Sequence, residues 1–186
     1  MRMKRRVRPI TARYLQNAAT FYLERYPSTA EGLRRVLQRR VRRAEMAEAP
    51  VMANVQQAID ALVAKFVASG VIDDKAFAQT KARALHRRGV SAKLTRRRLQ
   101  LAGIDAVTLD QALAGLDEEL HTEPKEREWK AATALARRRR LGPYRAEQDR
   151  KAARSRDLAA MARAGFDYEL ARKVIDAPDA ESLDEG

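Results

Sequence analysis

Cysteine is absent from the 186-residue chain, which excludes disulfides, thiolate metal sites and cysteine catalysis. Aromatic residues make up only 5% of the chain, and glycine and proline are few. This favours helices, because strands are enriched in aromatic and β-branched residues. No apolar run approaches the ~20 residues that cross a bilayer, and the basic start MRMKRRVRP is followed by no apolar stretch of the kind a secretory signal has. We therefore expect a helical protein of the cytoplasm.

Acidic residues are fewer than basic ones. The chain has 38 Lys and Arg residues against 25 Asp and Glu residues, a formal net charge of +13. An excess of this size indicates an anionic partner, which is nucleic acid, an anionic membrane face or an acidic protein surface. The composition alone does not choose among these three classes.

Apolar residues recur with helical spacing along most of the chain. The clearest case lies in 52–69, where they are Val55, Ile59, Leu62, Val63, Phe66 and Val67. Gly70 then ends a helix, and Asp73 and Asp74 open the next, because short acidic side chains accept from the unpaired N–H groups of a first turn. Ser28 with Glu31 predicts a capping box. Similar signals predict helices over 12–26, 28–45, 92–102, 106–120, 127–141, 145–165 and 168–177.

Two corners of the chain resemble each other. GIDAVTLDQAL, which begins at Gly103, superposes on GFDYELARKVI, which begins at Gly165. The pattern predicts an all-α fold of three tandem three-helix, helix-turn-helix-like repeats in an elongated, curved array, with a single nine-helix globule as the alternative. The expected parts are a disordered basic arm over 1–11, repeats over 12–70, 71–120 and 121–177, and an acidic disordered tail over 178–186.

The stretch GVIDDKAFAQTKARALHRRGVSAKLTRRRLQLAGID, residues 70–105, resembles the central signature of the RecX family of RecA modulators. In that family an apolar-Asp-Asp corner and a phenylalanine precede two basic helices, the second of which ends in Gly-apolar-Asp. ALARRRRLGPYR and LAAMARAGFDYELARKVI resemble the third repeat of the family, so the likeness covers roughly residues 12–177. The chain departs at Thr95, where the family has an apolar residue, and in a longer connection through Pro50.

This resemblance implies a helical regulator without enzymatic activity, cofactor or membrane partner, acting in DNA repair, recombination and the SOS response. Such proteins bind RecA, lie along the groove of its filament on single-stranded DNA, and suppress its recombinase, ATPase and coprotease activities. Direct contact with nucleic acid is a further candidate interaction. We expect a monomer, because three repeats already supply several contact points.

Between Asp74 and Asp105 the chain has basic residues but no acidic one. A surface of one sign indicates contact with phosphate or carboxylate, although a solvated face without a partner is the alternative. The predicted surface for the RecA filament or DNA consists of Lys81, Arg83, Arg87, Arg88, Lys93, Arg96, Arg97, Arg98, Arg137, Arg138, Arg139, Arg140 and Arg145. A secondary basic patch consists of Arg34, Arg35, Arg39, Arg40, Arg42 and Arg43.

Catalytic and metal-binding residues are not predicted. The acidic pairs at 73–74 and 118–119 stand at helix ends, and we interpret them as caps or solvated groups. His86 and His121 lack the i, i+4 partner of a helical metal site.

Several alternatives stay open. The second functional candidate is a DNA-binding protein or transcriptional regulator of the helix-turn-helix type, while a hydrolase or nuclease has no supporting residues. Trp129 and Phe77 fall on apolar faces and are assigned to the core rather than to base stacking. The acidic tail either folds back on a basic patch as a mimic of DNA or is a solubilising end; its acids are Asp176, Asp179, Glu181, Asp184 and Glu185.

Overall fold

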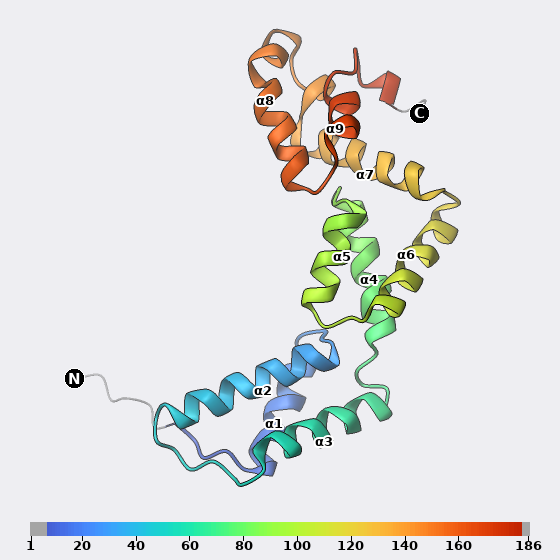
Figure 1. Cartoon of the computed structure of the whole chain (residues 1–186). Helices are drawn as coiled ribbons and strands as arrows, with labels where there is room; N and C mark the ends of the chain where they lie inside the picture. The colour runs from blue at the N-terminus through green and yellow to red at the C-terminus, as the bar shows by residue number, and fades with distance from the viewer. Residues whose placement is uncertain (1–6, 184–186) are drawn as a thin grey trace, which may run out of the picture. The chain divides into compact units, whose positions relative to one another are not determined.

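The computed structural model describes residues 7–183, and this part of the chain is helical (Figure 1). Over that range the only pairing of extended backbone is one bridge between Ile10 and Val51. The α-helices are α1 (Ala12–Leu23), α2 (Ala30–Glu45), α3 (Val55–Ala68), α4 (Asp74–Arg87), α5 (Ala92–Leu101), α6 (Ala106–Leu120), α7 (Pro124–Arg139), α8 (Glu147–Arg163) and α9 (Tyr168–Ile175). Two short 3-10 helices follow, η1 (Gly142–Tyr144) between α7 and α8 and η2 (Glu181–Leu183) after α9. The prediction of an all-α fold is confirmed.

Contacts divide the chain into two compact units. The first extends to Phe77 and includes Ala102–Ile104, and the second consists of Ala78–Leu101 and everything from Asp105 onward. The predicted elongated, curved array stays a prediction.

The first unit is built around α1, α2 and α3. Its fully buried side chains come from the apolar stripes of these helices, among them Leu15, Leu33, Leu37 and Ile59. The stripe predicted in 52–69 is confirmed at its centre but ends early, because Val67 is 46% exposed. At α2 the N-cap is Thr29, whose side chain accepts from the backbone N–H of residue 32, so the expected capping box at Ser28 is wrong by one residue.

The described residues next to both termini are more ordered than expected. Ile10 is 2% exposed; its N–H donates to the carbonyl of Pro50 at 2.8 Å, and its own carbonyl accepts from the N–H of Met52 at 3.0 Å. Disorder over 1–11 is therefore a wrong prediction for residues 7–11, while residues 1–6 lie outside the described part. At the other end η2 buries Leu183, whose carbonyl accepts from the indole Nε1 of Trp129 at 3.2 Å. The disordered tail is wrong for residues 178–183, and residues 184–186 are not described.

The second unit has its main apolar cluster among α7, α8 and α9, including Leu135, Met161, Phe166 and Val174. Short acidic caps begin its helices where the sequence predicts them. Asp105 accepts from the N–H of residue 108 at 2.9 Å, and Asp167 accepts from the N–H of residue 170 at 2.7 Å.

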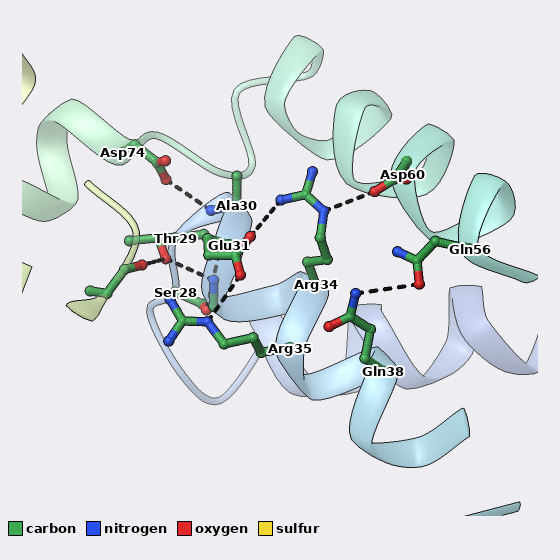
Figure 2. A network of polar contacts seen from close by, with 12 residues as sticks. Ser28, Thr29, Ala30, Glu31, Arg34, Arg35, Gln38, Gln56, Asp60 and Asp74 are labelled. Carbon is green, nitrogen blue, oxygen red and sulfur yellow. Dashed lines mark hydrogen bonds and ion pairs between the residues drawn. The ribbon is translucent and has the colours of Figure 1, made fainter. Parts of the chain in front are cut away.

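The amino termini of α2 and α5 are held in the same manner. At α2 the N–H of Ala30 donates to the carboxylate of Asp74 at 2.9 Å, and the Thr29 hydroxyl donates to the carbonyl of Ala102 at 2.5 Å (Figure 2). At α5 the N–H of Ala92 donates to the carboxylate of Glu128 at 2.9 Å. The preceding N–H, of Ser91, donates to the carbonyl of residue 164 at 3.1 Å.

The carbonyls that accept these bonds, of Ala102 and Ala164, each come just before a glycine that forms the turn between two helices, Gly103 or Gly165. A Cβ on Gly103 would lie 2.3 Å from the Cβ of Glu31, and one on Gly165 would lie 2.3 Å from the Oγ of Ser91, so only glycine lets the chains approach. The same combination of an acid, a carbonyl and a glycine occurs at both helix starts, which is compatible with tandem repeats; the repeats and their bounds stay a prediction.

Candidate cationic interface

Positive charge gathers on one face of α5. This helix contains no acidic residue, and its Lys93, Arg96, Arg97 and Gln100 follow the spacing i, i+3, i+4, i+7 that places side chains together. All four are exposed, whereas Leu99 is fully buried on the opposite face. The helix therefore presents a solvent-facing stripe, which we call the α5 stripe.

Thr95 is the position at which the chain departs from the pattern of the family it resembles. It is 3% exposed and faces the core with Leu99. The threonine thus occupies the inward position that an apolar residue would take. The departure leaves the outward face of α5 unchanged.

The α5 stripe forms one wall of a groove of about 770 Å³ within the second unit. The opposite wall is the corner between α8 and α9, where Gly165 approaches the start of α5 closely. The lining combines cationic and apolar side chains: Lys93, Leu94, Arg96, Arg97 and Gln100 from α5, and Ala162, Arg163 and Phe166 from the corner. A volume of this size falls in the range of ligand-binding clefts.

The cations of the groove differ in their partners. Arg96 forms an ion pair with Asp110. Within the described residues, no carboxylate lies within 4.0 Å of the charged groups of Lys93, Arg97 or Arg163, so their charge is available to a partner. Arg163 was not among the residues predicted from the sequence. Its position two residues before the corner glycine is the signal that would have pointed to it.

The basic residues at the end of α7 lie near those at the end of α4. Arg138 donates to the carbonyl of Arg88 at 2.8 Å, which brings the two helix termini together. Arg137 lies over the ring of Tyr144, with 5.9 Å between its guanidinium carbon and the ring centroid. Arg139 and Arg140 are exposed, and Arg140 ends α7 in the left-handed conformation.

On α4, Lys81, Arg83 and Arg87 are exposed. Arg83 forms an ion pair with Glu119 at 2.5 Å, so one acid of the pair at 118–119 is a partner for a cation. Arg98, on α5, is also exposed and lies outside the lining of the groove.

Arg145 is held by an internal ion pair. Its guanidinium donates to both carboxylate oxygens of Asp157, at 2.8 and 3.2 Å, and Asp157 is 2% exposed. The same carboxylate accepts from the N–H of Gly142 at 2.9 Å. Breaking a buried pair of this kind leaves a charge without compensation, so Arg145 stabilises the α7–α8 connection.

The secondary basic patch on α2 is partly occupied by internal contacts (Figure 2). Arg34 pairs with Glu31 at 2.7 Å and with Asp60 at 2.8 Å, and Arg35 pairs with Glu31 at 3.1 Å. Arg40 donates to the hydroxyl of Tyr14 at 3.3 Å. Arg39, Arg42 and Arg43 are exposed.

A polar cluster lies inside the second unit. Arg127 is 7% exposed, pairs with Asp117, and donates to the carbonyl of residue 113 at 3.4 Å. Burial lowers the pKa of His86, with a further contribution from the positive charge of Arg127. Burial also raises the pKa of Glu128, although the N–H of Ala92 opposes this shift. Local sequence patterns do not predict that Glu128 caps α5, because Ala92, whose N–H it accepts from, lies far from it in the chain.

The remaining candidates lie at helix ends and on apolar faces. Asp73 accepts from the N–H of Ala76 at 2.8 Å, which confirms it as a cap of α4. Phe77 and Trp129 are partly buried, in line with the predicted packing role. His121 ends α6 in the left-handed conformation. Over residues 7–183, no group of three or more His, Asp or Glu side chains is placed to hold a metal ion, and no helix there is long and apolar enough to cross a membrane.

Comparison with known proteins gives consistent results for sequence and fold, although no protein-family model matches the chain. The chain is 40% identical over 174 residues to "Regulatory protein RecX" of Myxococcus xanthus, a match that covers 93% of this chain and 90% of that protein. It is 27% identical over 171 residues to the protein of the same name from Agrobacterium fabrum, covering 92% and 86%.

Two solved structures share the fold. The crystal structure of a regulatory protein RecX matches with a TM-score of 0.55 at 19% identity, covering 89% of this chain and 72% of that chain. RecX from Lactobacillus salivarius matches with a TM-score of 0.57 at 18% identity, covering 94% and 97%.

Proposed function

The chain belongs to the RecX family of regulatory proteins, and on that premise we propose that it binds RecA and the RecA filament on single-stranded DNA. Binding inhibits the recombinase, ATPase and coprotease activities of RecA. The protein acts as a monomer in the cytoplasm and is not itself an enzyme.

The observation that carries this proposal is the α5 stripe with its facing corner. Over residues 7–183, three cations of the groove, Lys93, Arg97 and Arg163, pair with no carboxylate. Preorganised charge of one sign in a groove raises the rate and specificity of association with an anionic partner. The exposed arginines at the end of α7 add positive charge to the same unit.

The second candidate function, a helix-turn-helix DNA-binding protein, has support from the same helix. α4 and α5 are joined by a short turn, and α5 presents basic residues on its outward face. A recognition helix of that type enters the major groove of a duplex. Against it, the outward face of α5 forms one wall of a groove whose other wall is the α8–α9 corner, so a duplex would have to fit between the two.

RecA-catalysed ATP hydrolysis on single-stranded DNA separates the two functions. The DNA is saturated with RecA first, and the salt concentration is held fixed because phosphate binding depends on salt. Inhibition well below one protein per RecA monomer is the expected result. Inhibition only at protein concentrations that coat the DNA, together with a sequence-specific footprint on a duplex, would contradict the proposal and support the helix-turn-helix function.

A further inference from the structure

The groove between the α5 stripe and the α8–α9 corner has two kinds of surface. Its rim carries the positive charges of Lys93, Arg97 and Arg163, and its lining includes Leu94, Ala162 and Phe166. A surface that binds only phosphate needs the first kind and not the second. The combination fits a ligand that carries negative charge beside an apolar group.

One residue of the groove already pairs with a carboxylate from outside the lining. Arg96, a lining residue, is paired with the carboxylate of Asp110, whose side chain is 61% exposed. Exposed pairs are weak, so a partner's carboxylate is able to exchange with that of Asp110. At Arg96 the α5 stripe can therefore bind a carboxylate of a partner.

Nucleic acid fits the groove less well. Proteins that bind single strands without sequence preference stack bases on exposed aromatic rings. The one aromatic side chain in the lining, Phe166, is only 5% exposed and packs in the core of the second unit. A base that entered the groove would find no ring to stack on.

We propose that this groove binds an acidic segment of RecA in which carboxylates flank an apolar side chain. The carboxylates contact Lys93, Arg97 and Arg163, and the apolar side chain enters between Leu94 and Ala162. This inference rests on the proposed function and specifies the surface through which it operates.

Photo-crosslinking from inside the groove tests the identity of the occupant. Gln100 lines the groove, is exposed, and is replaced by the photoreactive p-benzoylphenylalanine in one full-length variant. Gln148, an exposed residue in the first turn of α8, receives the same replacement as a matched control. Each variant is irradiated with RecA filaments on single-stranded DNA, and the crosslinked peptide is identified by mass spectrometry.

The expected result is a crosslink from position 100 to a RecA peptide that contains acidic and apolar residues, with little product from position 148. Crosslinking to the DNA, to a RecA peptide without acidic residues, or equally from both positions overturns the proposal. ATPase inhibition by the same variants is measured in parallel. If the variant inhibits RecA but gives no crosslink from position 100, the groove is not the binding site, and the proposed function still holds. If even the unmodified protein does not inhibit RecA, both the groove proposal and the proposed function are wrong.

A second pair of variants tests the apolar part without a change of charge. Ala162→Leu adds bulk to the wall of the groove, and Ala152→Leu adds the same bulk at an exposed position of α8 outside it. We expect Ala162→Leu to raise the half-inhibitory concentration for RecA at least about fivefold, because the site for the apolar side chain is filled. Equal inhibition by the two variants would mean that the groove is not occupied.

Discussion

α2 and α5 begin in the same way but use their arginines differently. Each follows a capping residue, donates its first N–H to a carboxylate, and lies against a glycine of a distant turn. Ala30 of α2 corresponds to Ala92 of α5, so the next residue is Glu31 in one helix and Lys93 in the other. Glu31 pairs with Arg34 and Arg35 one turn later in α2. In α5 the lysine offers no such acid: Arg96 pairs instead with Asp110 of α6, and Arg97 has no carboxylate partner among the described residues. A count of arginines therefore overestimates the charge that a partner meets.

The largest expected effect is on stability, and it comes from breaking a buried ion pair rather than an exposed one. Asp157→Ala removes the buried acceptor of Arg145 and of the Gly142 N–H, and we expect it to lower the free energy of unfolding by about 3–5 kcal/mol. Asp60→Ala removes the exposed partner of Arg34 and should cost no more than about 1 kcal/mol. Urea denaturation followed by circular dichroism measures both. Equal costs would show that burial does not separate the two pairs.

The corner glycines come next. Gly103→Ala and Gly165→Ala each place a side chain at a positive φ, 90° and 93°, against the start of α2 or α5. We expect each to lower the free energy of unfolding by about 1–3 kcal/mol. Gly115→Ala, in the middle of α6 with open space around it, should instead raise stability by about 0.5–1 kcal/mol. A neutral result at both corners would contradict the close approach at the two joints.

Glu31→Lys makes the first turn of α2 resemble that of α5. The change removes the acceptor that Arg34 and Arg35 share and puts positive charge near the positive end of the helix dipole. The expected cost is about 1 kcal/mol of unfolding free energy. Inhibition of RecA should stay as it is, and this is checked by ATP hydrolysis. A loss of inhibition would indicate that RecA binds the first unit rather than the α5 stripe.

The smallest effect is the pH dependence of the second unit. Burial lowers the pKa of His86 below its ordinary value of 6.5. The unfolded chain then binds a proton before the folded one does, so stability present above pH 6.5 is lost as the pH falls through the folded pKa. His86→Gln should flatten this decline between neutral and mildly acid pH. His121→Gln, at an exposed position, is the control and should decline as the unchanged protein does.

Local signals predicted helices and their ends well. The caps at Asp73, Asp105 and Asp167 and the apolar stripe of α3 each depend on residues within a few positions of one another, and the structure bears them out. Internal similarity also pointed to Gly103 and Gly165, whose close contacts the structure reveals.

The features that could not be predicted from the sequence depend on contacts between residues far apart in the chain. Asp60, Asp110 and Asp157 each neutralise an arginine through folding, and no spacing in the sequence pairs them. Ile10 and Leu183 lie in segments rich in charged residues, and that composition led to a prediction of disorder. In the structure each of the two side chains is buried and anchors its segment to a core. The groove was not predicted because Arg163 is separated from α5 in the sequence by α6, α7 and most of α8.

The most direct test of the account is Lys93→Glu, assayed by RecA ATP hydrolysis on single-stranded DNA. The substitution makes α5 resemble α2, because an acid at this position reaches Arg96 and Arg97 one turn later. Lys151→Glu, at an exposed position of α8, changes the net charge equally and is the control. We predict that Lys93→Glu raises the half-inhibitory concentration at least about tenfold, or ~1.4 kcal/mol, while Lys151→Glu inhibits as the unchanged protein does. Equal inhibition by both variants would contradict the claim that the α5 stripe is the surface that binds RecA.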